Sequence, residues 1–239
     1  MFHKGVVWSL FDGSSYMVHD WALNGFKCYC FNYDDSDHGD YKGVKVIHEN
    51  IIYVNKFIDV NFLPDVYAMG IDRPDIIFAF PPCTDLAVSG TRSWKDKAKK
   101  NPDFQKEAVY TARLASWFSM KLGVPCLTEN PVGVLSTMWR KPNFIFHPFE
   151  YGGYLPENDK HPSFPYYIKA RDAYPKKTCI WVNGGFIIPP LAPVPVDSGK
   201  SKQYRQLGGN STRTKMIRSL TPRGFAKAVY QYNSKRFDK

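Results

Sequence analysis

The stretch GVVWSLFDGSSYMVHDWALNG, residues 5–25, decides the fold because its periodicity changes halfway along. Its first seven residues, Gly5–Phe11, form an apolar run with the length of a buried strand. The small residues of Asp12–Ser15 predict a turn, and Tyr16–Asn24 has the pattern of a helix that ends at Gly25. A strand that leads through a short turn into a helix is the first half of a βαβ unit.

The following residues repeat this alternation. Further strands are predicted at Lys27–Asn32, Ile51–Val54, Ile76–Phe80 and Val124–Thr128, and a helix is predicted at Phe104–Leu122. Strands that alternate with helices predict a mostly parallel central sheet with helices on both faces, which is a Rossmann-like α/β fold. Ligands of such sheets bind beyond the C-terminal ends of the strands.

Length and composition exclude several classes of protein. The chain has 239 residues, of which 44% are hydrophobic, with 17 Phe, 15 Tyr and 6 Trp. This is one domain of ordinary size with a small appendage, and it is apolar enough to bury a full core, which excludes a disordered chain. No run approaches the ~18 consecutive apolar residues of a membrane span, and the first residues lack the pattern of a secretory signal.

The net charge of +10 is concentrated at the C-terminal end. Residues 200–239 contain 11 Lys and Arg and a single acid, Asp238, whereas residues 1–199 are neutral overall. A basic cluster of this kind attracts polyanions, of which nucleic acid is the commonest, and a solvated basic face that only aids solubility is the alternative.

The five cysteines are an odd number with no C-x-x-C pair, which favours a reduced intracellular compartment. Cys126 and Cys179 lie in short apolar runs and are expected to be packing residues. Cys83 differs because it follows two prolines, where a strand must end. The six histidines show no metal-ligand spacing with each other or with cysteine, and we expect no metal.

Small and polar residues follow the strands at the edge where ligands bind. The first strand leads into Phe11-Asp12-Gly13-Ser14 and the second into Asn32-Tyr33-Asp34. A small turn lets a cofactor approach the backbone, and an acid after the second strand can accept hydrogen bonds from ribose hydroxyls. The pattern suits a nucleoside-containing cofactor, although a phosphate-binding G-x-G-x-x-G is absent and such turns also occur without a ligand.

Cys83 and Glu129 each come immediately after a predicted central strand, and therefore at the same edge of the sheet. A thiol and a carboxyl group at one edge suit addition to an electron-poor ring, with the thiolate as nucleophile and the acid protonating a ring nitrogen. The alternative is that Cys83 only caps its strand and Glu129 is an exposed loop acid.

The motifs SLFDGS, FNYD, FPPCT, TENP and IRSLTPRGFAKAV, in this order between about residues 5 and 232, resemble those of the DNA cytosine-5 methyltransferases, most closely their short phage and bacterial forms. Pro-Pro-Cys followed at this distance by Glu-Asn is specific to that family, whereas amino-group methyltransferases of DNA carry an Asp/Asn/Ser-Pro-Pro-aromatic turn. The resemblance implies a methyltransferase variant of the Rossmann-like fold, S-adenosylmethionine as cofactor and cytosine-containing DNA as partner.

The resemblance also assigns roles. The Cys83 thiolate would add to carbon 6 of a flipped cytosine while Glu129 contacts ring nitrogen 3, so that carbon 5 takes the methyl group. Asn130 would position the Glu129 turn, and Pro82 with its preceding proline would aim the thiol. The cofactor-binding residues that it implies are Phe11, Asp12, Gly13, Ser14, Asp34, Asn55 and Pro81.

The sequence departs from the family in four respects. Serine replaces the second glycine of the cofactor turn, and Glu-Asn-Pro stands where Glu-Asn-Val is more common. In the family, a Gln-x-Arg-x-Arg strand supports the catalytic loop and the target base. Here that strand is reduced to YPKKT, residues 174–178, in which Lys177 and Thr178 are candidates for the same role. The alternative is that the lysines are ordinary strand-edge charges. Only about 35 residues lie between the strand CIWV, residues 179–182, and the closing motif IRSLTPRGF, too few for a separate target-recognition domain. We therefore expect a catalytic core over 1–185, a proline-rich connector and basic segment over 186–218 as a reduced recognition region, and a C-terminal helix packing back on the core over 219–239.

Two segments are candidates for DNA contact. Residues 89–100 contain five basic residues and one acid, and Ser89-Gly90 suits the hinge of a mobile catalytic loop, with a solvated charged loop as the alternative. Residues 200–218 interleave basic and polar residues, which suits a flexible arm or a tail that orders on binding. The predicted contact residues are Ser89, Arg92, Lys95, Lys97, Lys99, Lys100, Lys200, Lys202, Arg205, Arg213 and Lys215.

Alternative functions remain open from the sequence. The same site would serve a free cytosine nucleotide or a modified sulfonium donor, and a catalytically silent DNA-binding homologue would share the basic segments. A cysteine hydrolase fits less well because no histidine lies in a turn near Cys83 in the sequence. We expect a monomer with no membrane partner, in the cytoplasm of a bacterial cell or phage-infected host.

Overall fold

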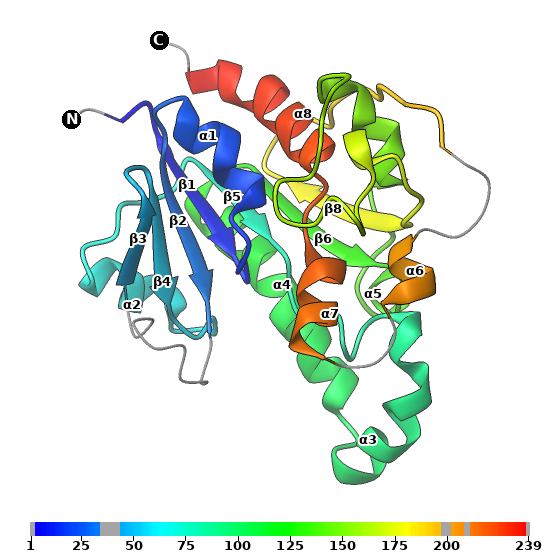
Figure 1. Ribbon diagram of the computed structural model, residues 1–239. Helices are drawn as coiled ribbons and strands as arrows, with labels where there is room; N and C mark the ends of the chain where they lie inside the picture. The colour runs from blue at the N-terminus through cyan, green and yellow to red at the C-terminus, as the bar shows by residue number, and fades with distance from the viewer. Residues whose placement is uncertain (1–2, 34–43, 197–201, 208–210, 238–239) are drawn as a thin grey trace. The chain divides into compact units, whose positions relative to one another are not determined.

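The computed structural model describes residues 3–33, 44–196, 202–207 and 211–237 (Figure 1). The chain folds as two compact units, one formed by residues 1–145 and 179–186 and the other by residues 146–178 and 187–239. Residues 146–178 thus group with the C-terminal part of the chain, whereas the sequence suggested consecutive segments.

The first unit contains the central sheet. Its strands are β1 (Val6–Leu10), β2 (Lys27–Asn32), β3 (Val44–His48), β4 (Ile51–Asn55), β5 (Ile76–Ala79), β6 (Cys126–Pro131), β7 (Phe144–Phe146) and β8 (Thr178–Asn183). Its helices are α1 (His19–Leu23), α2 (Phe62–Ala68), α3 (Trp94–Lys100), α4 (Phe104–Leu122) and α5 (Leu135–Met138), with 3-10 turns at Tyr16–Val18 and Val88–Ser93.

The strand order is β3-β4-β2-β1-β5-β6-β8-β7. The neighbouring strands from β4 through β6 pair in parallel, and β3 joins the edge antiparallel to β4. The direction of strand addition reverses between β1 and β5, and in open α/β sheets ligands bind at such a reversal, beyond the carboxyl ends of the strands. The predicted Rossmann-like fold with a mostly parallel sheet is confirmed.

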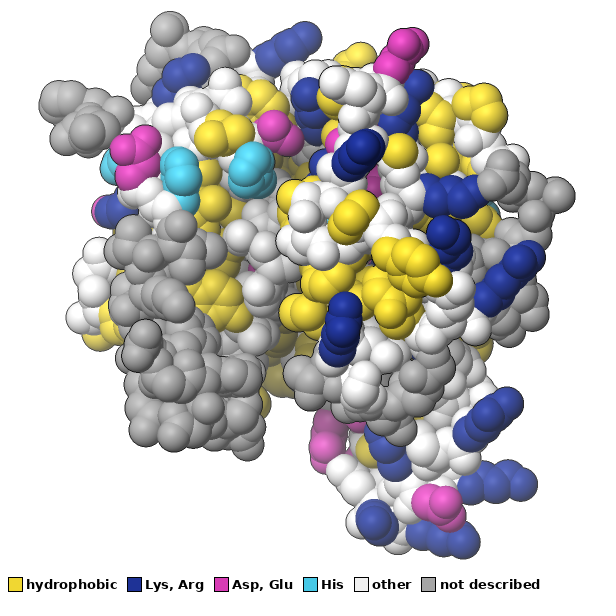
Figure 2. Space-filling view, viewed as in Figure 1, with side chains coloured by type: hydrophobic (Ala, Val, Ile, Leu, Met, Phe, Trp, Pro, Cys, Tyr) yellow, Lys and Arg dark blue, Asp and Glu magenta, His cyan; other side chains and the backbone are white. Residues whose placement is uncertain are grey.

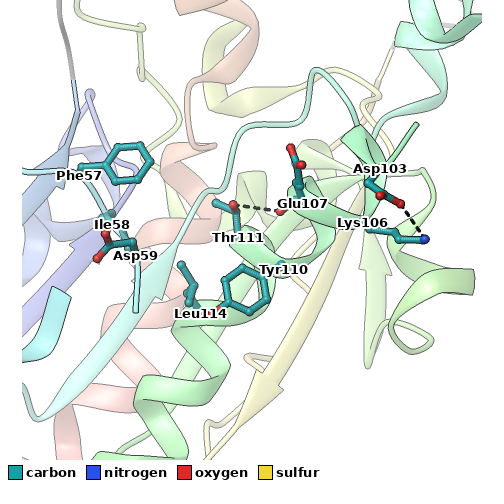
Figure 3. A pocket seen from close by; sticks show the side chains of 9 residues that line it. All are labelled: Phe57, Ile58, Asp59, Asp103, Lys106, Glu107, Tyr110, Thr111 and Leu114. Atoms are coloured by element: carbon teal, nitrogen blue, oxygen red, sulfur yellow. Dashed lines mark hydrogen bonds and ion pairs between the residues drawn. The ribbon is translucent and has the colours of Figure 1, made fainter. Parts of the chain in front are cut away.

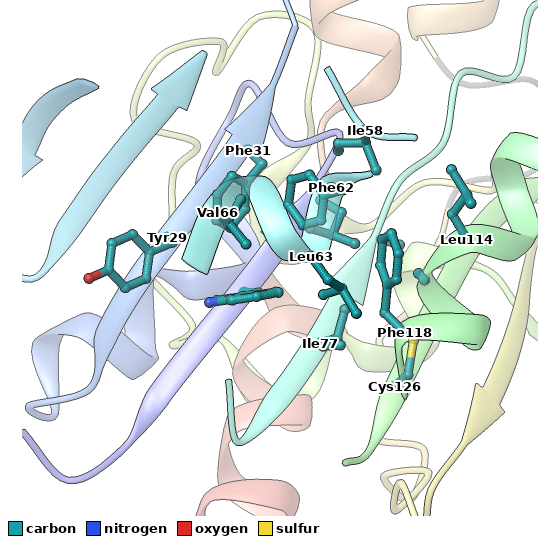
Figure 4. Close-up of a cluster of buried hydrophobic side chains, with 14 of the residues drawn as sticks. Tyr29, Phe31, Ile58, Phe62, Leu63, Val66, Ile77, Leu114, Phe118 and Cys126 are labelled. Atoms are coloured by element: carbon teal, nitrogen blue, oxygen red, sulfur yellow. The ribbon is translucent and has the colours of Figure 1, made fainter. Parts of the chain in front are cut away.

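Helices cover both faces of the sheet because successive strand residues point in opposite directions. Ile77 packs with Phe62 of α2 and Phe118 of α4 in a buried hydrophobic cluster (Figure 4). The next residue, Phe78, packs on the other face, where its ring centre lies 5.8 Å from that of Trp21 in α1. The helix α4 has the bounds that its periodicity predicts, and it ends at Gly123, whose φ of 64° is a left-handed cap.

Two predictions about the strands were wrong. The strand predicted at Val124–Thr128 lies at Cys126–Pro131, so Glu129 and Asn130 belong to the end of β6 instead of following it. The strand β3 was missed altogether, because Val44–His48 is a short edge strand that pairs on one side only.

The second unit consists of helices and turns around an aromatic core. Its helices are the short helices α6 (Lys202–Gln206) and α7 (Thr212–Ser219), the helix α8 (Arg223–Asn233), and 3-10 turns at Pro148–Tyr154, Ala170–Asp172 and Ser234–Phe237. Phe225 of α8 stacks on Phe146 with ring centres 4.3 Å apart and meets Tyr151 edge-on at 5.0 Å. A Cβ at Gly224 would lie 2.4 Å from the Tyr151 carbonyl oxygen, so this close packing requires glycine.

Among the helices that the structure describes, none combines the length and the apolar character that crossing a bilayer requires.

Candidate functional site

The turn after β1 is built around the buried carboxylate of Asp12, which is 3% exposed. One carboxylate oxygen accepts hydrogen bonds from the backbone N–H groups of Ser14 and Ser15, at 2.8 and 2.9 Å, and from the Ser14 hydroxyl at 3.0 Å. The other accepts from the Ser9 hydroxyl at 2.7 Å. Asp12 and Ser14, both predicted to bind a cofactor, therefore use these groups to shape the turn. Phe11 and Ser15 have positive φ values of 57° and 58° that this turn requires.

Polar groups from neighbouring strands converge above Gly13, which is exposed. A Cβ at this position would lie 3.5 Å from the Tyr53 hydroxyl of β4 and 3.8 Å from the Asn32 side-chain nitrogen at the end of β2. Asn55, another predicted cofactor residue, pairs with Asn32 in the β2–β4 register. Asp34 lies outside the described residues. The end of these strands thus offers a small backbone turn surrounded by hydrogen-bonding groups, as a polar nucleoside cofactor requires.

Aromatic rings extend this edge of the sheet. The rings of Tyr33 and Phe57, which follow β2 and β4, meet edge-on with centres 5.3 Å apart, and both side chains are more than half exposed. Phe57 also lines a cavity of about 550 Å³, which is bounded on its other side by the N-terminal half of α4 (Figure 3). The cavity is lined by Phe57, Ile58, Asp59, Asp103, Lys106, Glu107, Tyr110, Thr111 and Leu114. Its volume is in the range of small-molecule sites.

Sequence reasoning missed this cavity. One signal was present, because Phe57 and Ile58 follow a strand at the ligand-binding edge. The other wall could not be predicted, since it depends on how α4 packs beside that loop.

The residues after β5 and the end of β6 form the second part of the site. Ala79 pairs with Thr128 in parallel register, so the chain beyond Ala79 runs beside Glu129 and Asn130. The buried side chain of Asn130 donates a hydrogen bond of 2.9 Å from Nδ2 to the carbonyl oxygen of Pro81. This bond fixes the proline turn that precedes Cys83. Glu129 is half-buried one residue before Asn130.

The two loops that leave β5 and β6 are held together over several residues. The backbone N–H of Val134 donates to the Leu86 carbonyl at 2.9 Å, and the N–H of Val88 donates to the Val132 carbonyl at 3.1 Å. A Cβ at Gly133 would lie 1.9 Å from the Leu86 carbonyl oxygen, so only glycine allows the loops to approach this closely. Leu86 is fully buried in a cluster with residues of α4, α5 and β8. The loop that carries Cys83 is thus anchored to the core.

Cys83 is the exposed cysteine of the chain, and the other four are buried. Burial raises the pKa of Cys126 to about 12, and it raises the pKa values of Cys28 and Cys30 far above the ordinary range. A thiol is nucleophilic only as the thiolate, so these three buried thiols are inert. The backbone N–H groups of Leu86 and Ala87 donate to the Cys83 carbonyl, which makes a tight turn with the side chain at the surface.

The segment predicted to be a mobile catalytic loop is helical. Val88–Ser93 forms a 3-10 turn and Trp94–Lys100 forms α3. The helix carries the exposed basic side chains of Lys95, Lys99 and Lys100, and Figure 2 shows Lys and Arg side chains gathered around it. Lys97 forms an ion pair with Asp85 and is partly buried, and Lys99 forms a longer, exposed pair of 3.7 Å with Asp96. Ser89 and Arg92 are exposed in the 3-10 turn.

The other predicted DNA contacts belong to the second unit. Lys202 and Arg205 are exposed on α6, and Arg213 is exposed on α7, so the segment expected to be a flexible arm is partly helical. Lys200 and the side chain of Lys215 lie outside the described part of the structure. Lys177 is exposed just before β8 and groups with the second unit, whereas Cys83 belongs to the first.

Within the described residues, no group of three or more His, Cys, Asp or Glu side chains is placed to hold a metal ion.

Comparisons with known proteins give likenesses among solved structures. No protein-family model and no curated protein sequence matches the chain. A solved structure from E. coli, provisionally described as a DNA modification methyltransferase encoded within a prophage, aligns with 12% identity and a TM-score of 0.42. The alignment covers 74% of this chain and 45% of that one, so the chain spans less than half of that structure. The functional proposal below therefore rests on this chain's own residues.

Proposed function

We propose that the protein is a DNA cytosine-5 methyltransferase that uses S-adenosylmethionine. The observation that carries the proposal is the juxtaposition of Cys83 and Glu129 at the ends of adjacent parallel strands, with the exposed thiol on a turn that Asn130 holds through Pro81. The motif resemblance described above supports the same assignment.

Cytosine carbon 5 is too weak a nucleophile to take a methyl group unaided. In the proposed reaction the Cys83 thiolate forms a bond to carbon 6, and the electron pair of the 5,6 double bond moves toward carbon 5. Glu129 hydrogen-bonds or protonates ring nitrogen 3 and so stabilises the charge that develops in the ring. Carbon 5 forms its bond to the methyl group as the sulfonium–methyl bond breaks, which leaves a neutral thioether. A base removes the proton from carbon 5, and the bond between carbon 6 and sulfur breaks to release the thiolate.

The pairing of the two loops gives this chemistry its geometry. The bond from Asn130 to Pro81 and the close approach of Gly133 to Leu86 fix the thiol-bearing turn relative to the end of β6. A nucleophile held in position in this way avoids the entropic cost of ordering during the reaction.

The cofactor, when bound, supplies an electrophilic methyl group on a sulfonium. We assign its site to the edge formed by Gly13, Asn32, Tyr53 and Asn55, where a small turn and hydrogen-bonding side chains meet. The cavity beside Phe57 is the candidate seat for the purine ring, since it adjoins this edge and offers an aromatic wall.

The substrate we propose is DNA, because the chain carries its net charge of +10 in basic segments. We assign the exposed lysines of α3, which follow the nucleophile by fewer than 20 residues, to contacts with phosphates near the reacting base. A cytosine in a duplex must be flipped out of the stack, at a cost of a few kcal/mol.

The test is incubation of the protein with DNA and S-adenosylmethionine, followed by mass analysis of the digested nucleosides. We expect 5-methylcytosine, and we expect both Cys83→Ser and Glu129→Gln to abolish it. Cys28→Ala, which removes a buried thiol of β2 away from the Cys83 loop, is the matched control and is expected to retain activity. A product on another base, or another added mass on cytosine, would contradict the assignment of base or transferred group.

A second measurement isolates the covalent step. DNA that contains 5-fluorocytosine has no removable proton on carbon 5, so the linkage between carbon 6 and Cys83 should persist as a cofactor-dependent complex on a denaturing gel. Absence of the complex together with absence of any modified nucleoside would instead identify a catalytically silent DNA-binding protein.

A further inference from the structure

The second unit exposes an aromatic ring beside a lysine side chain. Tyr166 is 61% exposed, the highest value among the large tyrosine, tryptophan and phenylalanine side chains of the described residues. The ammonium group of Lys202 lies over its ring at 4.8 Å from the centre. Gln206, one turn further along α6, donates a weak hydrogen bond of 3.5 Å to the Tyr166 hydroxyl. The ring is thus held beside α6 while most of its surface stays open.

A second ring continues this arrangement toward α7. Tyr167 meets Tyr166 edge-on, with ring centres 5.1 Å apart and planes at 88°. The guanidinium of Arg213 lies 6.0 Å from the centre of the Tyr167 ring. Two basic helices therefore converge on two adjacent tyrosines.

The loop that carries these tyrosines is held by its own hydrogen bonds. The Nδ1 atom of His161 accepts from the backbone N–H groups of Ser163 and Phe164, at 3.3 and 3.0 Å. The N–H groups of Tyr167 and Ile168 donate to the Phe164 carbonyl, and Ile168 is buried. The exposed ring is therefore positioned before any partner arrives, which reduces the entropy lost on binding.

The C-terminal segment that supplies α6 and α7 carries charge of one sign. Residues 200–237 contain ten Lys and Arg and no Asp or Glu. Lys202, Arg205, Arg213 and Arg218 are exposed, and Lys176 joins them through a hydrogen bond of 3.0 Å to the Arg218 carbonyl. An open ring within a basic surface matches a partner that presents planar faces next to negative charges. Single-stranded nucleic acid does so at every nucleotide.

We propose that Tyr166, with Lys202, Arg205 and Arg213, forms a site that stacks an unpaired base of DNA and binds the flanking phosphates. The proposal rests on DNA as the substrate of the proposed function. It adds that the second unit distinguishes single-stranded from double-stranded DNA. In a duplex the base faces are already stacked, so the same contact requires unstacking. The site consequently favours single-stranded or locally opened DNA.

The experiment measures binding of a labelled, cytosine-containing oligonucleotide by fluorescence anisotropy, as a single strand and as a duplex, without cofactor. We expect the single strand to bind more tightly, and Tyr166→Leu to weaken it about 5- to 100-fold with an unchanged salt dependence. Tyr166→Phe keeps the ring and should retain the affinity. The matched control is Tyr67→Leu, which removes a partly exposed tyrosine, 41%, from α2 of the first unit and should leave binding unchanged.

Substitution of Lys202, Arg205 and Arg213 by Gln should lower the slope of log affinity against log salt by about 2, because each phosphate contact on a single strand contributes about 0.7. Binding of Tyr166→Leu within twofold of the wild type would overturn the proposal, as would an equal loss with Tyr166→Phe. Equal competition by polyglutamate and oligonucleotide would identify an acidic protein as the partner and also overturn it. Because the readout needs neither cofactor nor methyl transfer, an inactive protein can satisfy this proposal, and an active methyltransferase can contradict it.

Discussion

Two buried titratable groups in the second unit are expected to have opposite effects on its stability as the pH falls. His161 is 2% exposed, and burial together with the nearby Arg223 guanidinium lowers its pKa to about 4, although Asp159 acts in the other direction. Asp172 is 1% exposed, and burial raises its pKa to about 6 despite the hydrogen bond from the Gly224 N–H and the charge of Arg223.

The sign of each contribution follows from linkage. The folded-state pKa of His161 lies below the ordinary 6.5, so its contribution to stability is present above pH 6.5 and is lost as the pH falls toward 4. The folded-state pKa of Asp172 lies above the ordinary 3.8, so its contribution is present at low pH and is lost as the pH rises through 6. At 1.36 kcal/mol per pH unit, each is worth about 3 kcal/mol in full and about 2 kcal/mol between pH 6.5 and 4.5. The two nearly cancel in the wild type.

The perturbation that exposes this balance is Asp172→Asn. Asparagine can still accept from the Gly224 N–H, and it tolerates the positive φ of 50° at this position. Without the carboxyl group, the titration of His161 is uncompensated, so the free energy of opening of the second unit should fall by about 2 kcal/mol from pH 6.5 to 4.5. His161→Asn should have the opposite effect and make the unit more stable over the same range.

The assay is native-state hydrogen exchange of the amides in 161–172 and 222–229, corrected for the intrinsic pH dependence of exchange. Tryptophan fluorescence is unsuitable because all six tryptophans lie in the first unit. If the free energy of opening of Asp172→Asn varies as little with pH as that of the wild type, the reasoning is refuted, because burial then does not shift the pKa values of His161 and Asp172 in these directions.

Two further predictions concern the first unit. Iodoacetamide should modify Cys83 first and leave the four buried thiols unmodified until the protein unfolds. Intact mass and peptide mapping would measure the labelling. Rapid labelling of a second cysteine would contradict the burial of the other four thiols. Gly133→Ala places a methyl group 1.9 Å from the Leu86 carbonyl oxygen, so it should lower the free energy of unfolding measured in urea by about 2 kcal/mol or more and change the alkylation rate of Cys83. The control is Gly123→Ala, where the methyl group has open space but the φ is 64°. It should lower the free energy of unfolding by about 1 kcal/mol and leave the alkylation rate unchanged.

Several elements could be predicted because their signals are local. The alternation of strand, turn and helix over residues 5–25 and the periodicity of α4 depend on residues that are neighbours in the sequence. The double proline before Cys83 ends β5 for a local reason too, since proline lacks the N–H that a ladder needs. The strand β3 was missed because an edge strand carries a weaker apolar pattern, and α3 was taken for a loop because its seven residues contain few apolar side chains to show a period.

The amino-acid sequence by itself determined the α/β class and the presence of a cysteine and a glutamate near the ends of two strands, at the edge where sheets of this class bind ligands. Only the tertiary structure decided that β5 and β6 are neighbours, that Asn130 holds the proline turn, and that Gly133 allows the two loops to meet. It also brought residues 146–178 together with 187–239 and placed Tyr166 beside Lys202. The physical reason is that these contacts join residues 36 to 79 positions apart, and their energy comes from packing and hydrogen bonds that no local pattern encodes.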